Sequence, residues 1–330
     1  QEISLKAGNP SIALIGAGNH AARVLIPAFK KSGSILHTIN TTNGLNGTIH
    51  GKKNGFRFSS TDIQETIENE LIDTVVIATR HDSHANLVCQ ALEAGKNVYV
   101  EKPLAISLEE LDQVRNSFNK TLKDHKKINP KLMVGFNRRF SPHIKKMKSL
   151  IDNVDEPKSF IMTMNAGYIP HDHWVHDKSI GGGRIIGEAC HYIDLMRFLC
   201  SSKIKSFDAK SIKNNNPRFS KDDIATITLG FEDNSIGTIN YFSNGSDSYP
   251  KERIEVFSEN KAISLDNFRT MKGYGWKNFK NLRTWKQNKG QKECINAFID
   301  SIKTNTTLID INEILEVSEV SIKVSDILRN

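Results

Sequence analysis

A lysine that follows an apolar run is the first side chain that could exchange a proton with a substrate. Lys102 lies in Glu101-Lys102-Pro103, directly after the apolar run Val98–Val100. A lysine at the carboxyl end of a parallel strand points into the crevice where ligands bind, and it can hold a hydroxyl or relay its proton. We predict Lys102 as a catalytic and substrate-binding residue. The alternative is a solvated lysine beside a turn.

A histidine on a helical pattern is the second candidate. Gly181-Gly182-Gly183 precede Glu188, His191 and Asp194, which are spaced three residues apart. This spacing places Glu188 beside His191 on one helix face, and histidine suits proton transfer near neutrality. We predict that His191 is catalytic, that Glu188 and Asp194 bind substrate, and that the glycines let a ligand or another domain come close. The alternative is a structural histidine. No second His or Cys has metal-ligand spacing here, so no metal is predicted.

A glycine-rich turn near the start of the chain indicates a dinucleotide. The apolar run Ile12–Ile15 leads into Gly16-Ala17-Gly18-Asn19-His20-Ala21, followed by a helical pattern. In this G-x-G-x-x-A context the first glycine allows the turn, the second lets the backbone approach a pyrophosphate, and the small Ala21 lets helix and strand pack closely. The predicted cofactor-binding residues of the turn are Gly16, Gly18, Asn19 and His20.

The second apolar run decides between NAD and NADP. It normally ends in an acid that binds the ribose 2′-hydroxyl of NAD, but here Ile35–Ile39 is followed by Asn40-Thr41-Thr42-Asn43. These side chains, with Lys52 and Lys53 downstream, would tolerate a 2′-phosphate. We therefore expect NAD or NADP, with NADP favoured by a small margin. The predicted contacts are Asn40, Thr41 and Thr42.

The elements that must position these residues fall into two domains. Over residues 1–135, strongly apolar runs alternate with helical patterns, which predicts an α/β Rossmann fold, a doubly wound parallel sheet covered on both faces. The predicted strands are 12–15, 35–39, 74–78, 97–100 and 131–135, and the predicted helices are 21–31, 87–94 and one from Ser107.

Beyond about residue 136 the pattern changes to longer strands with polar alternation. They are expected at 158–168, 205–212, 223–231, 235–244, 252–258 and 262–266, with helices at 184–200 and 291–304. Asp233-Asn234 suggests a hairpin turn between two of them. Residues 136–330 are therefore predicted to form an α+β domain with a largely antiparallel, open sheet, which would bind substrate and mediate oligomerisation.

Composition excludes several classes of protein. The chain has 330 residues, of which 38% are apolar and 25% charged, and a net charge of +8. These are ordinary globular values, and solvated surface explains the basic residues better than a nucleic-acid patch. No apolar run approaches the roughly 18 residues that span a bilayer. Four cysteines without a CxxC pair predict buried thiols in a reducing compartment, so a cytoplasmic protein is expected.

Together these motifs resemble the Gfo/Idh/MocA oxidoreductase family from about residue 10 to the end of the chain. The resemblance implies a Rossmann domain followed by an open antiparallel sheet that often mediates dimerisation. It also implies reversible hydride transfer between the nicotinamide and a ring carbon of a sugar, sugar derivative or cyclitol. Lys102 and His191 would flank the reacting hydroxyl.

Two further segments carry the resemblance. The family's Thr-Pro-x-x-x-His pattern appears as Thr79-Arg80-His81-Asp82-Ser83-His84, and its arginine-rich segment as Gly135-Phe136-Asn137-Arg138-Arg139-Phe140. The additional cofactor-binding residues that this implies are Thr79, Arg80, His84, Glu101, Lys102 and Arg138.

The chain departs from the family pattern twice. The usual Asp four residues before the histidine is Gly187, so Glu188 is the candidate to replace it. The usual Pro after Thr79 is Arg80, which could contact an anionic substrate or the cofactor. The alternative for Arg80 is a surface ion pair with Asp82.

The sequences of three segments are similar to those of a subgroup of bacterial bi-domain proteins, namely Thr79–His84, Gly183–His191 and Gly290-Gln291-Lys292. In these proteins, a zinc-type alcohol dehydrogenase half precedes a Gfo/Idh/MocA half, and the start at Gln1 is what the second half alone would show. The resemblance implies a sugar-linked substrate, surface-polysaccharide biosynthesis, and a fused or separate zinc-type dehydrogenase as partner. A cofactor-binding sensor or scaffold without turnover is the alternative function.

Aromatic and polar residues of the second domain could form the sugar side of the site. Asn165–Trp174 contains Tyr168 and Trp174, which suit stacking on a sugar ring, and Arg184 opens the helix of His191. We predict Tyr168, Trp174 and Arg184 as substrate-binding residues; a loop packed over a sheet edge is the alternative. The same sheet region carries side chains that could bind a diphosphate or form a dimer interface, namely Lys251, Arg253, Tyr274 and Trp276.

Overall fold

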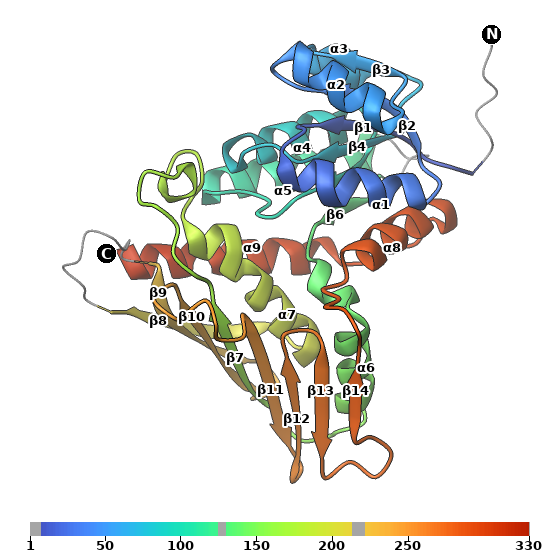
Figure 1. The fold of residues 1–330 in the computed structure, drawn as a ribbon. Helices are drawn as coiled ribbons and strands as arrows, with labels where there is room; N and C mark the ends of the chain where they lie inside the picture. The colour runs from blue at the N-terminus through green and yellow to red at the C-terminus, as the bar shows by residue number, and fades with distance from the viewer. Residues whose placement is uncertain (1–7, 125–129, 213–221, 330) are drawn as a thin grey trace. The chain divides into compact units, whose positions relative to one another are not determined.

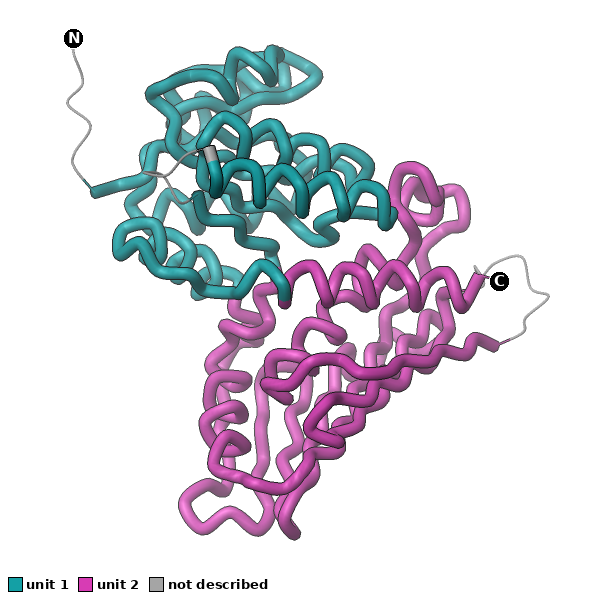
Figure 2. Tube along the Cα trace, turned by 180° about the vertical axis from the view of Figure 1, so that it is seen from behind, with its two compact units in different colours: residues 1–135, 291–312 teal, residues 136–290, 313–330 magenta. Residues whose placement is uncertain are grey.

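The computed structural model describes residues 8–124, 130–212 and 222–329, which form two compact units (Figure 2). Unit 1 comprises Gln1–Gly135 and Gln291–Asn312, and unit 2 comprises Phe136–Gly290 and Glu313–Asn330. The first boundary coincides with the predicted end of the first domain at residue 135. The segment Gln291–Asn312 departs from the prediction, because the chain returns to unit 1 after completing the second sheet.

Unit 1 is built on a six-stranded parallel sheet in the order β3-β2-β1-β4-β5-β6 (Figure 1). This order confirms the doubly wound Rossmann sheet. All of these strands except the edge strand β3 are almost entirely buried because helices cover them, which is why their sequences are apolar runs. Their bounds are β1 Ser11–Ile15, β2 Ile35–Asn40, β3 Phe58–Ser60, β4 Thr74–Ile77, β5 Asn97–Val100 and β6 Leu132–Val134.

The helices of unit 1 other than α8 lie between its parallel strands in the sequence. α4 packs against β4 and β5 and is itself covered by α5, and α1 packs against α8, the helix that returns from the far end of the chain. A π-helical turn, Ala21–Leu25, precedes α1. The helix bounds are α1 Ile26–Lys31, α2 Gly44–Asn54, α3 Ile63–Glu68, α4 His84–Glu93, α5 Leu108–Asp124 and α8 Gln291–Thr304.

Unit 2 contains an eight-stranded sheet in the order β14-β13-β12-β11-β7-β10-β9-β8. All neighbouring strands are antiparallel except β7 and β10, so the predicted largely antiparallel sheet is confirmed. The predicted hairpin at Asp233-Asn234 joins β9 to β10. The strand bounds are β7 Ser159–Asn165, β8 Ile204–Ser211, β9 Ile224–Phe231, β10 Ile236–Phe242, β11 Glu252–Ser258, β12 Lys261–Asp266, β13 Thr270–Tyr274 and β14 Asn281–Arg283.

Three helices accompany this sheet. α6 (Pro142–Ile151) follows the crossing into unit 2, α7 (Cys190–Cys200) packs against β10, and α9 (Ile311–Arg329) ends the chain. The predicted helix 184–200 is therefore α7 preceded by a π-helical turn, Ile185–Ala189. Strand β7 ends at Asn165, three residues before the predicted end, so Tyr168 lies in a loop.

Two expectations from composition can be compared with the structure. No helix in the described ranges is both long and apolar enough to cross a membrane. All four cysteines carry free thiols, and Cys190, Cys200 and Cys294 are buried.

Candidate functional site

The glycine-rich turn has the geometry that the cofactor needs. Gly16 has a φ of +93°, and a Cβ there would lie 2.5 Å from the carbonyl oxygen of Ala78, so the fold itself requires this glycine. Gly18 is different: a Cβ there would meet no protein atom within 4 Å. Gly18, Asn19 and His20 are all exposed. The second glycine therefore leaves room where the fingerprint brings a pyrophosphate, which fits a dinucleotide.

Glu101 connects this turn to the segment that carries Lys102. Because β4 lies between β1 and β5 in a parallel sheet, the carboxyl ends of these three strands lie side by side along the C-terminal edge of the sheet. There, Nε2 of His20 lies 3.3 Å from Oε1 of Glu101, and the hydroxyl of Tyr99 donates to the same oxygen at 3.4 Å. Burial alone would raise the pKa of Glu101, but the hydrogen bond and charge of His20, together with the electrostatic interactions of Lys102 and His84, lower that pKa. Glu101 is thus an anion that anchors His20 at this edge.

His84 holds the other side of the Lys102 segment. The imidazole is buried, with Nδ1 at 2.7 Å from the carbonyl oxygen of Pro103 and Nε2 at 3.3 Å from that of Thr79. Burial lowers the pKa of His84, so the neutral ring donates its single N–H through the shorter contact. The structure brings Thr79, His84, Glu101 and Lys102 to one edge of the sheet. Arg80, between Thr79 and His84 in sequence, is exposed.

The end of β2 departs from prediction at Asn40. Its amide is buried and donates to the carbonyl oxygen of Asp62 at 2.8 Å and to the hydroxyl of Thr66 at 3.2 Å. Asn40 therefore holds α3 in place instead of facing a ribose. The hydroxyl of Thr41 donates to the carbonyl oxygen of Asn43 at 2.7 Å, and Thr42 is exposed, so these two residues keep oxygen atoms that could accept from a ligand.

In unit 2, His191 lies in the first turn of α7, directly after the π-helical turn. Its side chain is 5% exposed, and its ring packs edge-on against Phe136 with centroids 6.3 Å apart. In the described residues the backbone is π-helical only here and after the glycine-rich turn. π-Helical turns are rare and occur often at functional sites.

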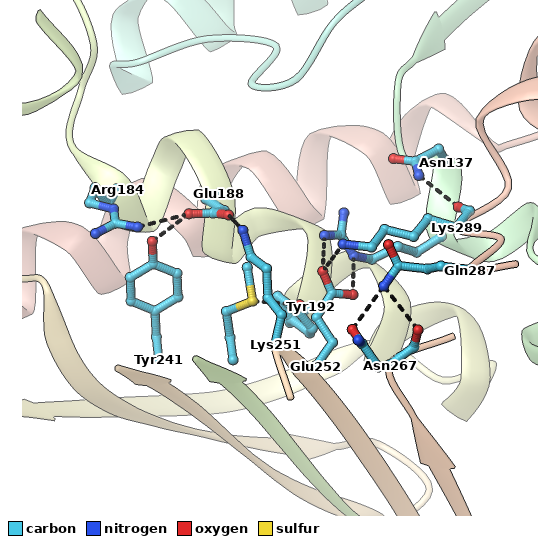
Figure 3. A network of polar contacts seen from close by, with 12 residues as sticks. Asn137, Arg184, Glu188, Tyr192, Tyr241, Lys251, Glu252, Asn267, Gln287 and Lys289 are labelled. Atoms are coloured by element: carbon cyan, nitrogen blue, oxygen red, sulfur yellow. Dashed lines mark hydrogen bonds and ion pairs between the residues drawn. The ribbon is translucent and has the colours of Figure 1, made fainter. Parts of the chain in front are cut away.

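Glu188 is the centre of a polar network on this helix (Figure 3). Its Oε2 accepts from the hydroxyl of Tyr241 at 2.6 Å and from Nη2 of Arg184 at 3.2 Å, and its Oε1 accepts from Nζ of Lys251 at 3.3 Å. Arg184 is 1% exposed and also donates to the carbonyl oxygens of Gly167 and Ala166 at 2.7 and 3.2 Å. The buried Arg184 therefore fixes the start of the Tyr168 loop, a different task from the predicted contact with substrate.

Profiles of known families match both units. The profile described as "Oxidoreductase family, NAD-binding Rossmann fold" matches residues 11–124, and the "GFO/IDH/MocA C-terminal domain" matches residues 144–264. The chain belongs to the Gfo/Idh/MocA oxidoreductase family.

Proteins of Bacillus subtilis and Thermotoga maritima are similar to the chain. An uncharacterised oxidoreductase, YrbE, of Bacillus subtilis is 29% identical over 64% of this chain and 60% of its own length. Myo-inositol 2-dehydrogenase of Thermotoga maritima is 26% identical over 66% of this chain and 64% of its own length. The matches thus span less than two thirds of these relatives. A levoglucosan dehydrogenase solved with NADH and levoglucosan has a TM-score of 0.82 and 20% identity, covering 97% of this chain and 96% of that one, which shows a shared fold.

The side chains of Arg138 and Arg139 are buried within unit 2. Arg138 was predicted to contact the cofactor, but it pairs with a carboxylate of its own unit. Nη2 of Arg138 lies 2.8 Å from Oε1 of Glu252, which Nζ of Lys289 approaches at 2.7 Å. Nε of Arg139 donates to both oxygens of Asp194 at 2.8 Å, and Nη1 of Arg139 lies 2.5 Å from Oε1 of Glu313. These arginines therefore hold β11 and α7.

Asp194 also departs from its predicted role in substrate binding. The side chain is fully buried, and burial raises its pKa to about 6 despite the positive charge of Arg139. A carboxylate enclosed in this way cannot reach a ligand, so Asp194 fixes α7 beneath His191 instead.

Two of the three glycines before this helix, Gly181 and Gly183, pack closely against protein atoms. A Cβ at Gly181 would lie 2.4 Å from the carbonyl oxygen of Val175, and one at Gly183 would lie 1.9 Å from Nη2 of Arg329. That guanidinium donates to the carbonyl oxygen of Gly182 at 2.8 Å and to Asp222 at 2.9 Å. Gly181 therefore admits its own loop and Gly183 admits the C-terminal helix, while the approach of a ligand to this segment stays a prediction.

The remaining predicted residues of unit 2 separate into two groups. Tyr168 is 40% exposed and Trp174 is half-buried, so both stay predictions as sugar contacts. Arg253 pairs with Glu255 at 2.8 Å, and Nε1 of Trp276 donates to the carbonyl oxygen of Ala262 at 3.0 Å.

Several of these residues were not predicted from sequence, namely Tyr241, Glu252 and Lys289 of the network and Arg139 of the ion pair with Asp194. Each lies on an element far along the chain from its partner. For Glu252 and Tyr241, the only local sign of such a role in the sequence is a charged or hydroxyl-bearing side chain at a strand position that would otherwise be apolar and buried.

Proposed function

We propose that the chain is an NAD(P)-dependent dehydrogenase or reductase that transfers a hydride between the nicotinamide and a hydroxyl-bearing ring carbon of a sugar or sugar-like substrate. The observation that carries the proposal is the 3.3 Å contact between His20 and Glu101. It joins the dinucleotide-type turn to the segment of Lys102 at one edge of one sheet. The names of relatives, myo-inositol 2-dehydrogenase and levoglucosan dehydrogenase, support a polyhydroxylated ring.

The chain's own residues would manage the proton of the reaction. Bound nicotinamide would supply the acceptor or donor of the hydride. When a C–H bond gives up its electron pair as hydride, the hydroxyl on the same carbon must release its proton. We assign Lys102 to hold and polarise that oxygen, and His191 to accept the proton. General acid–base catalysis of this kind contributes roughly 10²–10⁴-fold.

A panel of sugars, nucleotide sugars and cyclitols, followed by the absorbance of reduced nicotinamide, tests this function. Lys102→Ala and His191→Ala should each lower kcat by about 10²-fold or more with little change in cofactor Kd. Lys123→Ala, at an exposed position of α5, is the control. Unchanged turnover in both variants would refute these roles. Cofactor binding without turnover of any ring would favour the sensor or scaffold.

We also propose a preference for NADP. No Asp or Glu occurs between Glu2 and Asp62, so no carboxylate from β1, β2 or α2 is available to repel a 2′-phosphate. The exposed hydroxyl of Thr42 is the candidate donor to that phosphate, and Thr41, whose hydroxyl donates to Asn43, is a candidate only if that hydrogen bond is exchanged. Titration of the protein with NADPH and NADH by fluorescence is the test, and tighter binding of NADH would remove the preference.

The outward face of the sheet in unit 2 supports a homo-oligomer. Ile161, Ile236 and Phe257 are each at least 40% exposed, and the register places Ser159 between Ile236 and Phe257 on neighbouring strands. Light scattering of Ile236→Lys against the unmodified protein tests the assembly. A zinc-type dehydrogenase partner and a role in polysaccharide biosynthesis are proposals that rest on the motifs Thr79–His84 and Gly183–His191.

A further inference from the structure

The partners of Glu188 differ in how firmly they are held. Tyr241 and Arg184 are almost completely buried, and both bind the Oε2 oxygen. Lys251 binds Oε1 across 3.3 Å, and its side chain is 44% exposed while that of Glu188 is 25% exposed. Among the described residues Glu188 is the single polar partner of the Lys251 ammonium. Glu188 would keep its position without Lys251, whereas Lys251 can exchange its partner.

Lys251 also lies where the proposed sugar loop leaves the sheet. The N–H of Asn165, the last residue of β7, donates to the carbonyl oxygen of Lys251 at 2.8 Å. The loop that carries Tyr168 begins at the next residue, and Arg184 fixes its first two carbonyl oxygens. Lys251 is therefore a neighbour both of that loop and of the carboxylate three residues before His191.

The network contains more positive than negative charge (Figure 3). Four cations, Arg138, Arg184, Lys251 and Lys289, face two carboxylates, Glu188 and Glu252. Burial lowers the pKa of Lys289, Glu252 opposes this, and the charges of Arg138 and Lys251 lower it further. Glu188 is already paired with Arg184, and Glu252 with Arg138 and Lys289. Lys251 therefore adds a positive charge that repels the other cations, and a bound anion would relieve this repulsion.

We propose that Lys251 binds an anionic group of the substrate, a carboxylate or a phosphate, which replaces Glu188 as its partner. The inference rests on the proposed function and narrows it: the preferred substrate is an anionic sugar, and the neutral polyols are poor ones. Glu188 stays on Tyr241 and Arg184 during the exchange, so the helix of His191 keeps its position. No bond other than this ion pair changes.

Matched pairs of compounds test the inference. D-Glucose and D-glucuronate differ by a carboxylate, D-glucose and D-glucose 6-phosphate by a phosphate, and UDP-glucose carries a diphosphate. Each is tested with the cofactor-loaded protein for nicotinamide reduction and, independently of turnover, for binding by ligand-observed NMR. The three arms separate a sugar acid, a sugar phosphate and a nucleotide sugar.

Three variants separate the role of Lys251 from general effects. Lys251→Met removes the charge and keeps the length, Lys251→Arg keeps the charge, and Lys261→Met removes a lysine that pairs with Glu259 elsewhere in unit 2. We expect an anion to bind at least about tenfold more tightly than its neutral partner, and Lys251→Met to abolish that difference. Lys251→Arg should restore most of it, and Lys261→Met should leave it unchanged. The protein should remain folded, because an exposed ion pair contributes little to stability.

The outcomes distinguish this inference from the proposed function. Equal affinity for charged and neutral members, anion binding unaffected by Lys251→Met, or no binding of any anion would overturn the inference. If myo-inositol is oxidised without any preference for anions, the proposed function stands and the inference fails. If an anion binds in a Lys251-dependent manner but no compound is turned over, the inference stands and the proposed function fails.

Discussion

His84 and Pro103 are joined by a 2.7 Å hydrogen bond from the imidazole Nδ1 to the backbone carbonyl oxygen. Pro103 follows Lys102 directly, and the same ring contacts the carbonyl oxygen of Thr79 at the end of β4. One buried histidine therefore links the ends of two neighbouring strands and limits where the Lys102 backbone can move. This makes His84 a positioning residue for the proposed proton-exchanging lysine.

Replacing His84 by Ala should lower kcat by about 10²-fold, because a displacement of roughly 1 Å in a reacting group can cost that much. The cofactor Kd should change little. His84→Asn, whose amide can donate to the Pro103 carbonyl, should recover part of kcat. Stopped-flow turnover and cofactor titration measure the two quantities. A loss confined to cofactor affinity would show that His84 binds cofactor directly.

The two glycines of the dinucleotide-type turn should respond differently to Ala. Gly18→Ala should keep the unfolding temperature, because a Cβ there meets no protein atom within 4 Å, and should weaken cofactor binding at least about tenfold, or 1.4 kcal/mol. Gly16→Ala should destabilise the protein, since its φ is +93° and its Cβ would approach Ala78 at 2.5 Å. Thermal melts and cofactor titration suffice. A destabilised Gly18→Ala with normal cofactor affinity would contradict the assignment.

Glu252 should make unit 2 sensitive to acid. Burial alone would raise its pKa, but Arg138 and Lys289 hold the pKa of this carboxyl below its ordinary value of 4.5. As the pH falls, the unfolded chain therefore binds this proton at a higher pH than the folded chain does. The stabilisation that the ionised Glu252 gives to the fold is complete above about pH 4.5 and is lost as the pH falls through the folded pKa.

Glu252→Gln should remove this acid-dependent contribution. At neutral pH the variant should lose about 3–5 kcal/mol, because two buried cations lose their carboxylate. Urea unfolding between neutral pH and pH 3 measures both effects. Glu255→Gln, at a surface pair of the same strand, is the control. Parallel pH profiles for Glu252→Gln and the unmodified chain would show that Glu252 is not the source of the acid sensitivity.

Substitutions at Gly183 and Arg329 should have coupled effects on the free energy of unfolding. Gly183→Ala would place a Cβ 1.9 Å from Nη2 of Arg329, and overpacking of this kind typically costs about 1–3 kcal/mol. In Arg329→Met the added methyl meets a more flexible neighbour, so the second substitution should cost less than in the unmodified chain. A double-mutant cycle in urea gives the coupling energy, expected at about 0.5–3 kcal/mol. Strict additivity would mean that the backbone conformation of Gly183 alone causes the loss.

The sequence was sufficient for five of the six strands of unit 1 and for much of the sheet of unit 2. The short edge strand β3 was missed because Phe58–Ser60 is largely exposed and gives no apolar run. Strands such as Thr74–Ile77 are buried on both faces, so their composition alone identifies them. α2 was missed because it packs through Gly47, where a Cβ would lie 2.6 Å from Oγ1 of Thr41. Glycines that permit this closeness are poor helix formers, so local propensity opposes the observed helix.

Within the candidate site, the sequence identified motifs more reliably than the tasks of their side chains. The predictions for Asn40, Arg138, Arg184 and Asp194 assumed that a polar residue in a motif faces a ligand. Each instead satisfies a buried partner from an element remote in sequence, such as Asp62 for Asn40 or Glu252 for Arg138. Long-range pairing of this kind leaves no periodic signal along the chain.

The return of the chain to unit 1 has a consequence for the order in which the protein can form during synthesis. α8 packs against α1 but follows every strand of unit 2, and α9 then goes back to complete unit 2. The nucleotide-type unit therefore lacks one of its helices until the ribosome has passed residue 312. A chain that stops after Gly290 leaves both units incomplete. Release of a finished Rossmann unit ahead of its neighbour is thus ruled out by connectivity, and the two units must reach their final form almost together.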